Sequence, residues 1–239
     1  AIAISALKAI EKGNDPILLI SSSDHEIKYE NKFREAVKIG LKTAMENKLV
    51  TFGIKPTKAE TGYGYIEVVK DSDNDTLLSK PINRFIEKPN QEKAKEFISD
   101  DSYLWNSGIF IFKASRILDE LEKLQPKLFN LCKESLKNSS INFDFQRLEA
   151  RSFEKCPNIS IDYAVMEKTN NAHVIPLDAG WSDIGSWNKV WETSKKDLQN
   201  NYLEGNVLIK NSFDSLIKSE SRLLVALGIK NLVVIETSD

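Results

Sequence analysis

Short apolar runs alternate with amphipathic helical patterns in the first part of the chain, and this alternation restricts the possible folds most. Ile17–Ile20 is wholly apolar, residues 28–47 carry apolar side chains at helical spacing, and Leu49–Ile54 is again strand-like. A strand, a helix and a second strand in this order are typical of a βαβ unit in a parallel sheet. The unbroken apolar run at Ile17–Ile20 also predicts a central strand covered on both faces.

The pattern changes near residue 200, after which short strand-like runs are separated by polar turns. The 239 residues can form one large domain, or one domain with a small appendage. We therefore expect an α/β domain over residues 1–200 and the start of a small antiparallel β appendage over residues 201–239. Both ends look cut, because the chain begins inside a helical pattern without a start signal and stops directly after a strand-like run.

Composition excludes several classes of partner. Lysine and arginine (33) nearly balance aspartate and glutamate (35), so no overall basic field exists to bind nucleic acid. No run approaches the ~20 apolar residues of a membrane span. Cys132 and Cys156 match no metal-binding spacing, which favours two reduced thiols in a cytoplasmic protein, and two histidines are too few for a His-rich metal site. Small-molecule substrates are the expected partners.

The stretch Gly180-Trp181-Ser182-Asp183-Ile184-Gly185-Ser186-Trp187 predicts a strand, a tight loop and a helix. Asp183 lies where the strand ends, which is where ligands bind in open α/β sheets. A carboxylate half-buried between tryptophans needs a cation or hydrogen-bond donors as partner. Two hypotheses stay open for Asp183: a metal ligand, or the N-cap of a helix over residues 186–192.

Asp24 follows the strand Ile17–Ile20 and the serines at 21–23, so it too lies near the carboxyl end of a strand. Its alternative role is the cap of the helix over residues 28–47. We expect Asp24 and Asp183 to converge on one side of the sheet, close enough for a single ion to bridge them.

Four further candidate site residues lie at the ends of predicted elements, in the loops between them, or within a predicted strand. Gly64 belongs to a loop where glycine permits close backbone approach to a ligand, although a tight turn explains it equally well. Lys88 ends a strand and would by default be a surface lysine, whereas Asn106 begins a polar patch within an apolar strand. We expect Lys88 and Asn106 to face the same cleft. Asp162 lies in the first turn of a helical pattern, where the helix dipole favours an acid.

Six motifs, taken together and in order, resemble the mannose-1-phosphate guanylyltransferases (GDP-mannose pyrophosphorylases), in the form often fused to a phosphomannose isomerase. The motifs are Ser-Asp-His at 23–25, Glu-Thr-Gly-Tyr-Gly-Tyr at 60–65, Glu-Lys-Pro at 87–89, Trp-Asn-Ser-Gly at 105–108, Ser-Ile-Asp-Tyr-Ala-Val-Met-Glu-Lys at 160–168 and the Asp183 octapeptide. The resemblance implies a Rossmann-like nucleotidyltransferase fold, with a mixed sheet between helices and one cleft for sugar phosphate and nucleotide.

The resemblance also implies roles for particular residues. Asp24 and Asp183 would be the magnesium carboxylates, and Lys88 would contact the sugar phosphate. The remaining substrate-binding residues would be Gly64 through its backbone, Glu87, Asn106 and Asp162. These residue types suit the implied reaction, in which GTP and mannose 1-phosphate give GDP-mannose and pyrophosphate, because Mg²⁺ binds few carboxylates together with phosphate oxygens. No covalent intermediate is required, in agreement with the absence of an evident activated nucleophile.

The most important departure from the family pattern is that the chain contains no glycine-rich loop of the form G-G-x-G-x-R-L-W-P; a smaller one is the run of serines at 21–23 before Asp24. Such a loop cradles phosphates through its backbone N–H groups, so impaired GTP binding and turnover are expected of this sequence. The alternatives are a non-catalytic sugar-phosphate-binding fragment, or a nucleotidyltransferase for another sugar or base. A missing central strand would expose apolar strand edges, so self-association into a homo-oligomer is one expected state.

Overall fold

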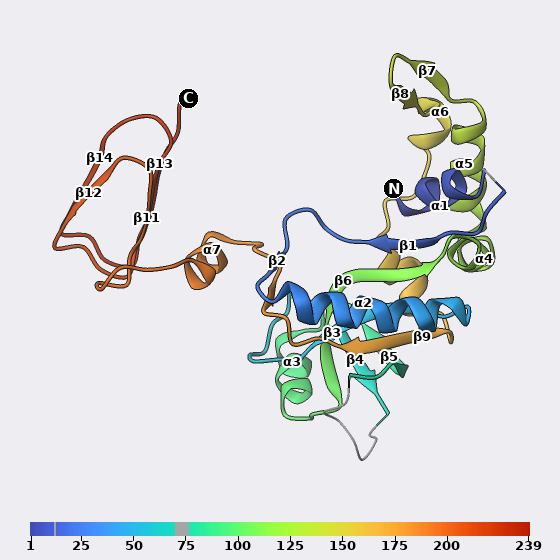
Figure 1. Ribbon diagram of the computed structural model, residues 1–239, viewed down its shortest axis with the longest axis horizontal. Coiled ribbons are helices and arrows are strands. Elements are labelled where there is room, and N and C mark those ends of the chain that lie inside the picture. Colours follow the sequence, from blue (N-terminus) through green and yellow to red (C-terminus); the bar gives the residue numbers. More distant parts are fainter. Residues whose placement is uncertain (12, 70–76) are drawn as a thin grey trace. The chain divides into compact units, whose positions relative to one another are not determined.

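The computed structural model describes residues 1–11, 13–69 and 77–239, which form two compact units (Figure 1). The first unit comprises Ala1–Ser23 and Lys28–Ala179, and the second comprises Asp24–Ile27 and Gly180–Asp239. The second unit therefore starts before the β appendage predicted for residues 201–239, and a domain boundary at residue 200 stays a prediction. No helix in the described ranges has both the length and the apolar character that crossing a membrane requires.

The first unit is built on a six-stranded mixed sheet, as the predicted fold class requires. In sheet order its strands are β1 (Ile17–Ile20), β6 (Tyr103–Lys113), β3 (Leu49–Ile54), β9 (Ala172–Pro176), β5 (Lys80–Ile86) and β4 (Tyr65–Val68). β3 pairs with β9 in parallel, and the other described pairs of this sheet are antiparallel. β1 and β3 run in the same direction, as in a βαβ unit, but β6 lies between them.

The prediction that Ile17–Ile20 is a central strand is wrong for the described sheet, in which β1 lies at one edge. Leu18 and Ile20 pack against the main hydrophobic cluster, whereas Leu19 is 47% exposed. A run of aliphatic residues predicts a strand that is buried by neighbouring elements. It does not specify whether that strand lies at the centre or at the edge of the sheet.

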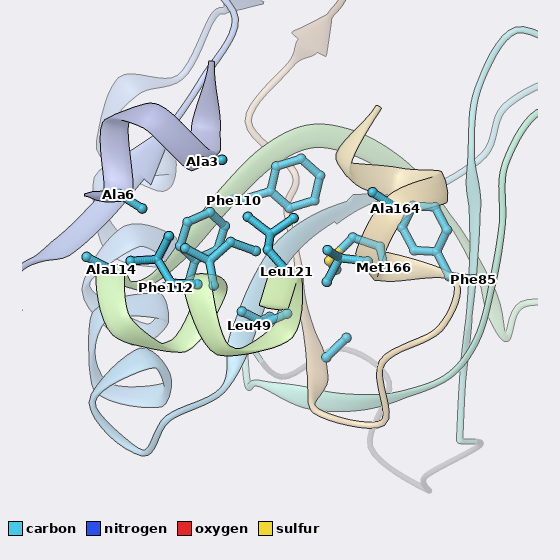
Figure 2. Packing of buried hydrophobic residues seen from close by; sticks show 14 of the residues in the cluster. Ala3, Ala6, Leu49, Phe85, Phe110, Phe112, Ala114, Leu121, Ala164 and Met166 are labelled. Carbon is cyan, nitrogen blue, oxygen red and sulfur yellow. The ribbon is translucent and has the colours of Figure 1, made fainter. Parts of the chain in front are cut away.

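Helices and their connections complete the first unit. They are α1 (Ile2–Ile10), α2 (Glu30–Met45), α3 (Gln91–Ile98), α4 (Ala114–Leu124), α5 (Pro126–Lys137), α6 (Ala150–Phe153), the π-helix η1 (Asp162–Met166) and the hairpin of β7 (Ser140–Asn142) and β8 (Phe145–Arg147). The main core joins side chains of α1, α4, β6 and η1, including Ala6, Phe112, Leu121 and Met166 (Figure 2). Burial of such aliphatic and aromatic groups provides most of the driving force for this packing.

The second unit contains β2 (Glu26–Ile27) and β10 (Trp181–Ser182) as a short antiparallel ladder, followed by α7 (Trp187–Thr193). Five strands follow: β11 (Tyr202–Glu204), β12 (Val207–Lys210), β13 (Leu216–Ser219), β14 (Leu224–Leu227) and β15 (Val233–Glu236). β11, β13 and β15 form one parallel sheet, and β12 and β14 form another. The β strands predicted after residue 200 are therefore present, but their predicted antiparallel direction is wrong.

The chain alternates between these two sheets, so each strand pairs with the strand two elements away in the sequence, and such strands run in parallel. Gly205 lies between β11 and β12 with φ +84°, and a Cβ placed there would lie 1.9 Å from the backbone oxygen of Ser219. Only glycine fits a backbone contact of this kind. Short apolar runs separated by polar turns occur both in antiparallel hairpins and in a chain that alternates between two parallel sheets. The sequence pattern therefore does not distinguish the two strand directions, which explains the error in the prediction.

Candidate functional site

Four of the predicted site residues in the first unit come together around the junction of β4, β5 and β6. Gly64 precedes β4, Glu87 follows β5, Asn106 lies within β6 and Asp162 is the first residue of η1. The backbone N–H of Asn106 donates to the oxygen of Gly64 at 2.8 Å, and the Asn106 Nδ2 donates to Asp162 Oδ1 at 3.0 Å. Residues far apart in the sequence thus form one polar cluster.

Glu87 contributes a carboxylate to this cluster, and its side chain is only 7% exposed. Its Oε1 pairs with Lys88 Nζ at 3.1 Å, whereas its Oε2 is buried and has no hydrogen-bond partner within the described residues. A Cβ at Gly64 would lie 2.5 Å from that Oε2, so the glycine provides the space that the carboxylate occupies. A buried acceptor without a donor is costly and fits a ligand hydroxyl.

Electrostatics distinguish the charged groups of the cluster. Burial, followed by the negative charge of Asp162, raises the pKa of Glu87, although pairing with Lys88 opposes the shift. Burial likewise raises the pKa of Asp162. The hydrogen bond and charge of Glu87 raise the pKa of Lys88, whose side chain is 57% exposed. The ammonium therefore stays charged and accessible to an anion.

Thr51 of β3 orients the Asn106 amide and was not among the predicted site residues. Its fully buried hydroxyl lies 2.9 Å from Asn106 Oδ1 and 3.0 Å from the oxygen of Ile109, and donates to them. Because the amide oxygen faces this donor, Nδ2 faces the Asp162 carboxylate. A threonine in the otherwise apolar strand Leu49–Ile54 was the available signal, since a buried hydroxyl needs a partner.

A second buried cluster supports the backbone on both sides of these polar groups. Tyr65 follows Gly64, Trp105 precedes Asn106, and both pack with Ala94 and Phe97 of α3. The pairing of β3 with β6 also shifts register between Thr51 and Gly53, next to the Asn106 position. Such irregularities redirect side chains at functional sites, so local packing and the bulge together place Asn106.

Asp24 and Asp183 belong to the second unit, where the β2–β10 ladder brings their segments together. In this ladder Ser182 pairs with Glu26 and Trp181 with Ile27, so Asp183, which follows Ser182, and Asp24, which precedes Glu26, lie at the same end. Among the described residues no group of three or more His, Cys, Asp or Glu side chains forms a metal cage. Two carboxylates nevertheless suit Mg²⁺, which takes its other ligands from water and phosphate.

The helix-cap alternatives for both aspartates are wrong. Ser186 is the N-cap of α7, and its hydroxyl accepts from Lys189 N at 3.3 Å. Tyr29 is the N-cap of α2, without a side-chain hydrogen bond. Asp183 instead lies in a tight loop in which Ile184 has φ +46° and a Cβ at Gly185 would come within 2.9 Å of Asp183 Oδ2. Neither carboxylate is thus explained by helix capping.

Replacing Glu87 with glutamine should stabilise the chain more at about pH 7 than at about pH 4. The pKa of Glu87 is raised above its ordinary value of 4.5, chiefly by burial. As pH rises from below 4.5 through the raised pKa, the folded parent must ionise a buried group and loses stability, whereas the glutamine variant does not. Urea unfolding of both chains across this range measures the difference.

The matched control is Glu96→Gln, which removes an exposed carboxylate of α3. The free-energy difference between Glu87→Gln and its parent should widen with pH. A difference that is constant or narrows with pH would contradict the electrostatic account of Glu87.

A mixed sheet with helices packed against it, and with a lysine, two acids and an amide gathered beside its strands, is the arrangement found in α/β proteins that bind ligands at strand ends. Residues 1–200 match the family model described as nucleotidyl transferase. The chain belongs to the nucleotidyl transferase family, which confirms the resemblance found in the sequence.

Named relatives agree with this assignment. The chain is 43% identical over 242 residues to a mannose-1-phosphate guanylyltransferase of Salmonella montevideo, and 44% identical over 242 residues to the xanthan biosynthesis protein XanB of Xanthomonas campestris. All of this chain is covered in both cases, but only 51% and 50% of those relatives. The chain thus spans about half the length of the curated relatives it matches.

Two solved structures are similar in fold. One is described as a mannose-1-phosphate geranyltransferase from Thermus thermophilus, with a TM-score of 0.84, 26% identity, and coverage of 100% of this chain and 68% of that one. The other is described as a mannose-6-phosphate isomerase from Helicobacter pylori, with a TM-score of 0.67, 34% identity, and coverage of 76% and 68%. The first likeness extends over the whole chain and confirms the nucleotidyltransferase fold.

Proposed function

We propose that this chain carries the sugar-phosphate site and the metal carboxylates of a mannose-1-phosphate guanylyltransferase, which makes GDP-mannose and pyrophosphate from GTP and mannose 1-phosphate. The observation that carries the proposal is the cluster of Gly64, Glu87, Asn106 and Asp162 beside Lys88. Support for the substrate comes from relatives that bear this activity in their names.

In the proposed complex each residue has a distinct task. The Lys88 side chain is 57% exposed, and its ammonium neutralises the phosphate of the sugar. The unpartnered Glu87 Oε2 accepts from a sugar hydroxyl, and the second N–H of the Asn106 amide donates to another. Gly64 leaves the space that lets the Glu87 carboxylate stand at the sugar. The cluster thus combines one cation for the phosphate with polar groups for the ring.

Asp24 and Asp183 would hold Mg²⁺ in this proposal, and the ion would supply charge neutralisation at the phosphates when bound. The contribution of the chain is to present two carboxylates from one end of the β2–β10 ladder. Lys88 and the polar cluster orient the sugar phosphate, so that positioning and charge stabilisation contribute most of the rate enhancement. GTP as the nucleotide and a cytoplasmic location belong to the same proposal, the latter supported by the free thiols of Cys132 and Cys156.

Titration calorimetry of the 239-residue chain with mannose 1-phosphate tests the proposal directly. We expect binding in the range of about 1 μM to 1 mM, as is common for metabolic substrates. Mannose and inorganic phosphate, titrated separately, should each bind more weakly by at least an order of magnitude, because each lacks half of the contacts.

An assay of GDP-mannose formation then separates the alternatives. Turnover by this chain, or by a variant in which a glycine-rich loop of the family form is joined before Ala1, supports a guanylyltransferase. Binding of mannose 1-phosphate without turnover by either chain supports a non-catalytic sugar-phosphate-binding protein. Preference for another sugar phosphate or another nucleotide would contradict the proposed substrates.

A further inference from the structure

The segment Glu87-Lys88-Pro89 adopts a backbone conformation that needs support from elsewhere in the fold. Lys88 has φ +47°, in the left-handed region that residues other than glycine seldom occupy. The strain lies directly between the buried carboxylate of Glu87 and the start of α3, whose N-cap is Asn90. Strained positions persist only where neighbouring contacts hold them, and they concentrate at functional sites.

One such contact comes from Glu167, which is distant in the sequence and was not among the predicted site residues. The backbone N–H of Glu87 donates to Glu167 Oε1 at 2.9 Å, across 80 positions of the chain. Glu167 is itself exposed to solvent. Because the Glu167 side chain is exposed, it adds little to core packing. Its hydrogen bond to the Glu87 N–H instead fixes the backbone conformation next to Lys88.

The π-helix explains why Glu167 reaches this position. Glu167 follows η1 as its C-cap, and its N–H donates to the oxygen of Asp162 at 3.0 Å, which is the i→i+5 bond of a π turn. Phe85 of β5 belongs to the same buried cluster as Ala164 and Met166 of η1 (Figure 2). Single π turns are frequent at functional sites. Here the turn places Asp162 against Asn106 of β6 and Glu167 against the Glu87 N–H that follows β5.

We propose that Glu167 is a positioning residue for the sugar-phosphate site, acting by holding the Glu87–Lys88 backbone in its left-handed turn. The inference rests on the proposed function, since it assigns the held groups to the sugar phosphate. Asp162, at the start of η1, reaches Asn106 Nδ2, while Glu167, at its end, reaches the Glu87 N–H. One π turn thus fixes the two sides of the site relative to each other.

The test compares Glu167→Ala with Glu167→Gln in the 239-residue chain. Glutamine keeps a side-chain oxygen that accepts from the Glu87 N–H, whereas alanine has none. Two quantities are measured: amide hydrogen exchange at Glu87 by NMR in the free chain, and the Kd for mannose 1-phosphate by calorimetry. Glu167→Ala should speed exchange and raise Kd by roughly 3- to 10-fold, as expected for one lost hydrogen bond, while Glu167→Gln should stay within about 2-fold of the parent.

The two readouts separate this inference from the proposed function. Failure of the parent to bind mannose 1-phosphate would overturn the proposed function, while exchange at Glu87 would still decide whether Glu167 holds the backbone. Unchanged exchange and Kd in Glu167→Ala would overturn the positioning role. Equal losses in the alanine and glutamine variants would also overturn it, because the effect would then follow the charge and not the hydrogen bond.

Discussion

Replacing Lys88 with alanine should weaken mannose 1-phosphate binding by roughly 10- to 100-fold, the loss expected when a charged hydrogen bond worth about 1.5–3 kcal/mol is removed. Lys88 Nζ is the cation that pairs with the buried Glu87 carboxylate, and because the Lys88 side chain is 57% exposed, its ammonium is accessible to a phosphate. Without it, Glu87 loses the partner whose hydrogen bond and charge lower its pKa. The phosphate would then approach a buried acid with no balancing cation. Calorimetry with mannose 1-phosphate measures the change.

Two further variants keep this prediction specific. Lys88→Met retains the aliphatic stem but not the ammonium, so it should lose affinity to the same extent as Lys88→Ala. Lys93→Ala removes an exposed lysine on the neighbouring α3 and should leave Kd within about 2-fold. If Lys88→Met bound mannose 1-phosphate as well as the parent does, the phosphate-contacting role of Lys88 would be wrong.

Local signals in the sequence predicted single elements well. The helical spacing over residues 28–47 predicted a helix, and α2 spans Glu30–Met45. The apolar runs at Ile17–Ile20 and Leu49–Ile54 are strands β1 and β3. Turn residues and side-chain periodicity act within a few positions of the chain, so they specify elements without reference to distant partners.

Pairing between elements was less predictable, for a physical reason. The spacing of apolar residues within a segment does not show that β6 lies between β1 and β3. It also does not show that β11 pairs in parallel with β13. Both depend on how the chain closes over long distances. A short apolar strand satisfies its burial in either direction, and so its sequence carries little information on direction.

For the candidate site, the sequence provided the polar groups but not the groups that orient them. Glu87 and Asn106 stand out as polar side chains at strand ends or within apolar strands. Thr51 also interrupts an apolar strand, but its hydroxyl alone does not show which group it orients, and Glu167 is one exposed acid among many. Their roles follow from hydrogen bonds to residues 55 and 80 positions away.

The substitution Gly64→Ala should reduce mannose 1-phosphate affinity by roughly 10-fold or more while leaving the chain folded, since a displaced carboxylate would lose at least one hydrogen bond to the sugar. A Cβ at Gly64 would lie 2.5 Å from Glu87 Oε2 and 3.3 Å from Asn106 Cβ. The close atom is the end of a flexible side chain, so Glu87 can move and the fold can survive. The movement would take Oε2 away from the sugar in the proposed complex. Calorimetry reports Kd, and thermal unfolding reports stability.

Gly62→Ala is the matched control, because it makes the same change two positions earlier in the same loop, where a Cβ meets nothing within 4 Å. Both variants lose the same backbone freedom, so a difference between them reports the contact with Glu87 and not the loss of glycine flexibility. Gly62→Ala should bind mannose 1-phosphate like the parent. Equal affinity of the two variants would show that the space beside Glu87 Oε2 is not required, and would remove Glu87 from the proposed sugar contacts.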